Sequence, residues 1–218
     1  MNFFGRKNPT ERAEELHNLI EQDNIRKGIR TLLPYHQLAF GVMITERFLP
    51  NYFAFHLVEQ WGNPMVLLNG IDLLKDIVAQ KSHNPEDLQI IDDLIESVTP
   101  DMDDFGGNML ASLALDVSSM LYECFTFVRT QDAKHIEICS NISFDSLALY
   151  VQKRDKIPHD LSPAELEARL GKEPLILQEA DFQLNLLRDL AQQANIDHKL
   201  YITQTLSAPN LRLREMGG

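Results

Sequence analysis

The chain has 218 residues, of which 44% are hydrophobic, and a formal net charge of −12. This apolar fraction is ordinary for a globular protein, so a disordered chain is not the default expectation, and one domain can accommodate the length. The acidic balance excludes a nucleic-acid partner, because phosphate binding needs a basic stripe, and it favours a basic protein or a cation. Residues 1–7 contain no continuous apolar run, so we predict no signal peptide and a cytoplasmic protein. The two cysteines, Cys124 and Cys139, lie in apolar helical runs and are predicted to be buried thiols.

Several helix starts are marked by a capping residue followed by proline. The four pairs are Asn8-Pro9, Asn63-Pro64, Asn84-Pro85 and Ser162-Pro163. The side chain at the N-cap accepts a hydrogen bond from a free backbone N–H, and proline at the first helical position has no N–H to lose. No alternating strand pattern and no Asn-Gly or Asp-Gly hairpin turn occurs. The sequence therefore predicts an all-α protein.

The helices expected from the sequence follow one another closely. The first covers about 9–33, and Asp23-Asn24 and Gly28 leave open whether it breaks in two. The second begins near Tyr35 and is expected to stop or kink at Pro50, restart over 51–60 and end at Trp61-Gly62. Further helices are predicted at about 64–80, 85–98, 106–129, 132–155, 162–170, 173–195 and 197–206.

The segment 106–129 is expected to be the centre of the fold. Its polar residues fall in one stripe about 80° wide on a helix: Asn108, Ser112, Asp116, Ser119, Glu123 and Thr126. Other helices must surround the apolar remainder, and two carboxylates near the middle exclude a membrane span. We predict a single-domain bundle of about eight or nine helices over residues 35–206. Residues 1–34 would form a helical extension packed on it, and residues 207–218 a frayed tail.

A combination of motifs identifies a family. The motifs are Glu46-Arg47-Phe48-Leu49-Pro50-Asn51-Tyr52, Asp103-Asp104-Phe105, Asp116, Glu123, Gln178-Glu179 and Asp181. With them the chain resembles the bacterial YjaG-like family, a domain of unknown function, over about residues 35–203. This resemblance implies one all-helical domain of a bacterial cytoplasmic protein, and it supplies no catalytic residues.

Six residues are candidates for a ligand site: Glu46, Arg47, Asn51, Tyr52, Asp116 and Glu123. Seven positions separate Asp116 from Glu123, which is about 10 Å along a helix axis. This distance is too long for one metal ion or a retaining carboxylate pair, so each would need partners from other helices. Alternatively, the stripe is the exposed edge of the central helix or is paired with basic residues. We expect Asp116 to be buried and hydrogen-bonded within the bundle.

No cofactor and no metal is predicted. A di-iron bundle needs two Glu-x-x-His motifs, whereas the chain has one, Glu14 to His17, and a weaker match from Asp132 to His135. Residues 101–106 imitate a calcium loop but lack its later ligands, so helix capping explains these acids better. The sequence contains no Gly-x-Ser-x-Gly elbow, phosphate loop or dinucleotide fingerprint.

Residues 85–104 contain eight acidic residues and no Lys or Arg. Such a run is typical of a solvated face and can also dock a basic partner. The partner-binding candidates are Asp92, Asp93, Glu96, Asp103 and Asp104. We therefore predict a non-catalytic interaction or regulatory module and favour no enzymatic activity, with a homodimer left open. The alternative is a small-ligand binder or enzyme whose carboxylate-containing site lies between helices.

Overall fold

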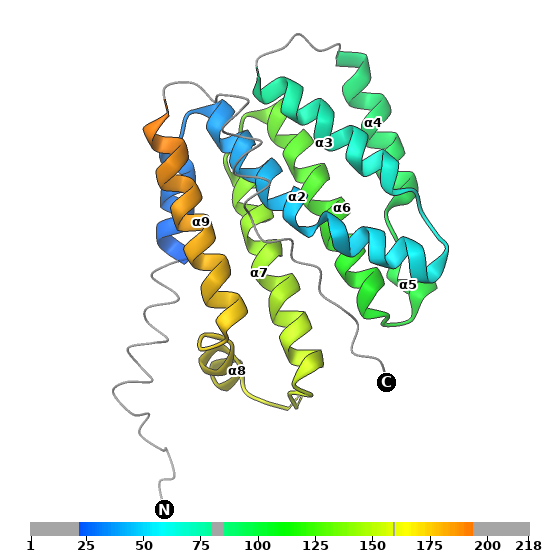
Figure 1. The fold of residues 1–218 in the computed structure, drawn as a ribbon, viewed down its shortest axis with the longest axis vertical. Helices are drawn as coiled ribbons and strands as arrows, with labels where there is room; N and C mark the ends of the chain where they lie inside the picture. Colours follow the sequence, from blue (N-terminus) through cyan, green and yellow to red (C-terminus); the bar gives the residue numbers. More distant parts are fainter. Residues whose placement is uncertain (1–21, 80–84, 159, 194–218) are drawn as a thin grey trace, which may run out of the picture.

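The structure is a computed structural model that describes residues 22–79, 85–158 and 160–193. Within these residues every regular element is a helix, so the all-α prediction is confirmed (Figure 1). Residues 22–31 are helical and continue past Asp23-Asn24 and Gly28 without a break. The expected start at Asn8-Pro9, the helix at 197–206 and the tail at 207–218 lie outside the described residues.

Eight further helices follow in chain order within the described residues. They are α2 (Pro34–Glu59), α3 (Pro64–Val78), α4 (Pro85–Val98), α5 (Met102–Phe105), α6 (Met109–Thr130), α7 (Lys134–Arg154), α8 (Pro163–Leu170) and α9 (Pro174–Gln192). The short helix α5 was not predicted, and α6 begins at Met109 and not at 106.

Of the two outcomes predicted at Pro50, a stop or a kink, the stop with a restart over 51–60 is wrong. The α2 helix runs without interruption through this proline, and both Leu49 and Pro50 are helical. A proline inside a helix costs about 3 kcal/mol through the lost hydrogen bond and the clash with the preceding turn. Burial of most of α2 offsets that cost, since helix stability in proteins comes mainly from tertiary packing. The helix ends at Glu59 with Gln60 as its left-handed cap, directly before Trp61-Gly62, where the end was predicted.

The capping signals place helix starts correctly. The side chain of Asn63 accepts a hydrogen bond from the N–H of Met65, and Ser162 and Glu165 form a reciprocal capping box. The Asp101 carboxylate accepts from the N–H of Asp103, so capping accounts for the acid at the start of the sequence that resembles a calcium loop. Asn108 caps α6 in the same way.

The α6 helix lies at the centre of the described bundle, which confirms the predicted central apolar helix. It packs against α2 and α7, and also against α3, α4 and α5 (Figure 1). All six residues of its polar stripe are partly exposed. By length and composition α6 could cross a membrane, but 56% of its most apolar window is buried inside the bundle.

Two helices form the outer parts of the fold. The α4 helix lies at one edge and packs on α3 and α6, whereas α9 lies on the other side and packs on α2 and α7 (Figure 1). The helical residues 22–31 also pack closely, because Ile25 and Ile29 are almost fully buried. A Cβ at Gly28 would lie 2.8 Å from Leu187 of α9, so glycine permits this close approach.

Candidate functional site

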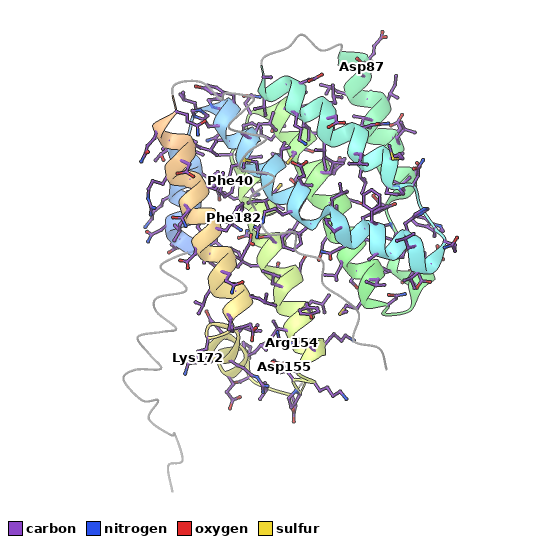
Figure 2. The ribbon with its side chains drawn as sticks, in the orientation of Figure 1. Phe40, Asp87, Arg154, Asp155, Lys172 and Phe182 are labelled. Atoms are coloured by element: carbon purple, nitrogen blue, oxygen red, sulfur yellow. The ribbon has the colours of Figure 1, made fainter. Side chains whose placement is uncertain are left out.

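The adjacent residues Glu46 and Arg47 of α2 point to different neighbours. Lys75 of α3 donates to the Glu46 carboxylate at 2.6 Å. Arg47 donates to Glu179 of α9 at 2.7 Å, and its guanidinium carbon lies 3.6 Å from the centre of the Phe182 ring. Figure 2 shows Phe182 where α9 passes the middle of α2. These two candidates therefore join α2 to two separate helices and do not form one ligand site.

The Arg47–Glu179 pair belongs to a buried polar network. Glu179 accepts further hydrogen bonds from Ser143 at 3.2 Å and from Gln183 at 2.7 Å. Ser140 donates to Gln183 at 2.6 Å. All five side chains are buried, the least so being Arg47 with 4% exposure. The network fixes the contact between α2, α7 and α9. The Glu179 carboxylate accepts its hydrogen bonds from residues inside the bundle.

Sequence reasoning did not find this network. Its signal was a set of polar residues at helical spacing on otherwise apolar faces, Ser140 and Ser143 on α7 and Glu179 and Gln183 on α9. Such spacing places side chains on one side of a helix. The pattern indicates burial of polar groups only when both helices are known to face each other.

The other two candidates in α2 are both fully buried. Tyr52 is fully buried, and its hydroxyl donates to the backbone carbonyl of Val98 at 2.5 Å. Burial raises the pKa of Tyr52 to about 12, against a smaller opposing effect of a backbone hydrogen bond. Asn51 is fully buried beside it in the chain. Tyr52 therefore ties α2 to the last residue of α4, 46 positions away.

Asp116 is partly buried and has one hydrogen bond among the described residues. The hydroxyl of Ser146, on α7, donates to its carboxylate at 2.5 Å. Burial raises the pKa of Asp116 to about 6; the Ser146 hydrogen bond lowers it, and the nearby Asp145 raises it further. The expectation of a hydrogen-bonded Asp116 is met, but full burial and a cationic partner are not found in the described part of the chain.

Glu123 also faces α7 but does not share a site with Asp116. Its carboxylate lies 2.6 Å from Nδ1 of His135, near the start of α7. Each of the two carboxylates thus meets a different α7 residue. This arrangement agrees with the separation expected from helix geometry and gives neither a shared metal site nor an acid–base pair.

A cavity of about 380 Å³ lies between α4 and α6. Its lining combines two carboxylates with hydroxyl groups: Ile95, Glu96, Thr99, Ser118, Ser119, Tyr122 and Glu123. Here a residue predicted to bind a ligand, Glu123, meets one predicted to bind a partner, Glu96. The polar stripe of α6 therefore faces α7 along one side and this cavity along the other.

A second cavity, of about 270 Å³, lies where α7, α8 and α9 meet. Its wall is mainly apolar, with the two acidic residues Asp145 and Glu167. None of the residues proposed from sequence lines it.

The predicted partner-binding acids are divided between two environments. Asp92 is ion-paired with Arg129 of α6, and burial raises its pKa although the arginine lowers it. Asp93, Glu96, Asp103 and Asp104 are exposed. Asp87, in the first turn of α4, projects away from the bundle (Figure 2). Four of the five candidates can thus meet a partner.

The described residues include no group of three or more His, Cys, Asp or Glu side chains that could hold a metal ion. Glu14 and His17 lie outside the described part of the chain. Cys124 and Cys139 are free thiols, both fully buried as predicted, with their sulfur atoms 3.8 Å apart.

Comparisons with known proteins agree with this architecture. The sequence model of one family, described as protein of unknown function (DUF416), matches residues 24–206. A solved structure of a DUF416 family protein from Shewanella baltica OS155 is similar, with a TM-score of 0.73 at 21% identity, and the match covers 82% of this chain and 90% of that one. No curated protein matches the chain.

Proposed function

The chain belongs to the DUF416 family of proteins of unknown function, and we propose that it is a non-catalytic interaction module that binds a basic protein. The proposal includes the narrower resemblance to YjaG-like proteins, a bacterial source and a cytoplasmic location. It also includes the predicted organisation of the chain: an N-terminal helical extension over residues 1–34, a bundle domain over 35–206 and a C-terminal tail over 207–218.

The observation that carries the proposal is a set of exposed acids without basic partners, which we name the acidic face: Asp93, Glu96, Asp103 and Asp104. No Lys or Arg of the described residues forms an ion pair with any of them. Some other acids of the bundle do have basic partners, as at Glu46–Lys75 and Arg47–Glu179. Exposed charges of one sign raise the association rate of an oppositely charged partner and select against others.

The interior supports the absence of catalysis. The most deeply buried carboxylate, Glu179, is held by an arginine, a serine and a glutamine, and Arg47, the least buried of these side chains, is 4% exposed. A catalytic group needs contact with substrate and a pKa suited to proton transfer. These buried side chains satisfy one another's charge and hydrogen bonds, so they stabilise the bundle.

A second candidate function is binding of a small cation in the cavity between α4 and α6. The observation in its favour is that Glu96 and Glu123 line this cavity together with the hydroxyl groups of Thr99 and Ser119. This arrangement suits an amine, because carboxylates and hydroxyls accept the hydrogen bonds that an ammonium group donates.

The test of the leading proposal is a fluorescence titration of the full chain with a labelled nona-lysine peptide at low salt. The probe variant replaces three acids of the acidic face: Asp93→Asn, Asp103→Asn and Asp104→Asn. The matched control replaces three exposed acids elsewhere: Asp160→Asn, Glu167→Gln and Asp181→Asn. Both variants change the net charge by the same amount, so a difference between them reports position.

We expect the acidic-face variant to bind roughly tenfold more weakly than the control variant, and the difference to shrink as salt is added. Equal binding by the two variants would show that net charge alone attracts the peptide and would contradict the proposal.

A further inference from the structure

The outward side of α4 differs from an ordinary solvated helix face. The residues that face the bundle are Leu88, Ile91, Ile95 and Val98, each at most 8% exposed. Ile90 and Leu94 lie one turn apart on a side of α4 that is about 100° round the helix from the buried side, and they are 57% and 43% exposed. Single exposed apolar residues are common, but two at positions i and i+4 form a continuous apolar strip.

Acidic and polar residues flank this strip at helical spacing. Glu86 and Asp93 lie four positions before and three positions after Ile90, and both are exposed. Gln89 donates to the Asp93 carboxylate at 2.9 Å and holds it on the surface. The outward side of α4 thus combines an apolar strip with negative charge.

The position of α4 leaves this side open to a further helix. The helix lies at the edge of the described bundle, where it packs on α3 and α6 (Figure 1). The nearest cation of α6, Arg129, is paired with Asp92, which is partly buried. Positive charge on a partner would therefore meet acids on the outward side.

We propose that the partner presents a basic amphipathic helix, which packs along the outward side of α4. Its apolar residues would cover Ile90 and Leu94, and its Lys or Arg side chains would lie against Asp93 and its acidic neighbours. This inference rests on the proposed function and specifies its partner. Recognition of an amphipathic helix through apolar anchors at i and i+4 with flanking charges is a recurrent binding mode.

Charge argues against a second copy of this chain as the occupant. In a symmetric dimer, the same surface meets itself, so the acids beside Ile90 and Leu94 would face acids of the other copy. Like charges placed together across an interface are unfavourable. A basic amphipathic helix can cover the apolar strip and also place positive charge against the acids.

The size of the surface sets the expected strength. The 14 residues of α4 span about 21 Å, which is enough for about four turns of a partner helix. One helix face of this length buries less area than a stable protein–protein interface, so we expect an affinity on the order of micromolar.

The test uses three labelled probe peptides of 14 residues and equal positive charge. One is a Lys–Leu peptide with its leucines at helical spacing, the second has the same composition in scrambled order, and the third replaces the leucines by serine. The variant is Ile90→Ser with Leu94→Ser, and the control is Leu57→Ser with Val58→Ser. The control residues are 62% and 58% exposed on α2, so both variants are expected to keep the fold, which circular dichroism checks.

We expect the full chain to bind the amphipathic peptide at least roughly tenfold more tightly than the scrambled one. The Ile90/Leu94 variant should lose this preference, and the Leu57/Val58 control should keep it.

Equal binding of all three peptides, lost on neutralising the acidic face but unchanged in the Ile90/Leu94 variant, would overturn this inference and leave the proposed function standing. Failure of every basic peptide to bind would overturn both. A dimer in sedimentation that the Ile90/Leu94 variant dissociates would also overturn the inference, because a second copy would then be the occupant.

Discussion

The guanidinium of Arg47 donates to the carboxylate of Glu179 across 2.7 Å, and the two side chains are 4% and 0% exposed. The pair joins α2 to α9 across 132 positions of the sequence. The Nε atom of Arg47 is buried without a hydrogen-bond partner among the described residues, and this leaves part of its desolvation uncompensated. The Phe182 ring covers the guanidinium and adds a cation–π contact.

Removal of one partner from this pair is expected to be strongly destabilising. Arg47→Met should lower the free energy of unfolding by about 3–5 kcal/mol, because Glu179 would be left inside the bundle without its cationic partner. Urea denaturation of the two proteins measures the difference. The control is Arg188→Met, an exposed arginine, for which we expect a change within about 0.5 kcal/mol. Similar stabilities of the Arg47 and Arg188 variants would contradict the structural role of the pair.

Asp116 is expected to make stability depend on pH. Its pKa is about 6 in the folded protein and near 3.8 in the unfolded chain, so the folded state binds the proton first as the pH falls. Stability should therefore rise as the pH is lowered from 7 to 4, by about 2 kcal/mol relative to Asp116→Asn. The asparagine keeps an acceptor for Ser146 and does not titrate. The measurement is denaturant unfolding of both proteins at several pH values; a difference that stays constant would disprove the raised pKa.

Gly62 should not tolerate a side chain. Its φ is +74°, and a Cβ would lie 2.3 Å from the Tyr52 hydroxyl, which is held by the carbonyl of Val98. Gly106, with φ +51° and no atom within 4 Å of a Cβ, is the matched control. We expect Gly106→Ala to cost about 1–2 kcal/mol from the backbone alone. Gly62→Ala should cost roughly 1–3 kcal/mol more because of overpacking, as thermal melts can show.

A second substitution tests the clash between the Gly62 position and Tyr52. In the Gly62→Ala background, Tyr52→Phe removes the atom that the new methyl group meets. The second substitution should then cost less than it does in the wild-type protein, where it removes a buried hydrogen bond. Equal costs in the two backgrounds would place the strain elsewhere.

Local chemistry explains which parts of the fold could be predicted from sequence. The caps at Asn63 and Ser162 depend on hydrogen bonds that span two or three residues, so a short motif contains all the required information. The apolar circumference of α6 likewise indicates a central helix without knowledge of its neighbours. Pro50 misled the prediction because its local cost is offset by packing that a short motif does not encode.

The candidate site could be predicted less well, since its contacts are long-range. The charges of Glu46 and Arg47 are evident in the sequence, but their partners lie 29 and 132 positions away on different helices. The acidic run was easier to interpret, because α4 packs through one face and leaves most of its charged residues outside. Asp92 was the exception, since Arg129 reaches it from α6.

The most direct test of the account measures stability and binding on the same proteins. Arg47→Met and the triple variant Asp93→Asn, Asp103→Asn and Asp104→Asn are each unfolded in urea and titrated with the labelled nona-lysine peptide at low salt. Binding is measured without denaturant, at a temperature well below the melting point of each variant. We predict that Arg47→Met loses stability and keeps its affinity, whereas the triple variant keeps its stability and loses roughly tenfold in affinity. Loss of binding in folded Arg47→Met, together with unchanged binding by the triple variant, would contradict the account and place the binding site inside the bundle.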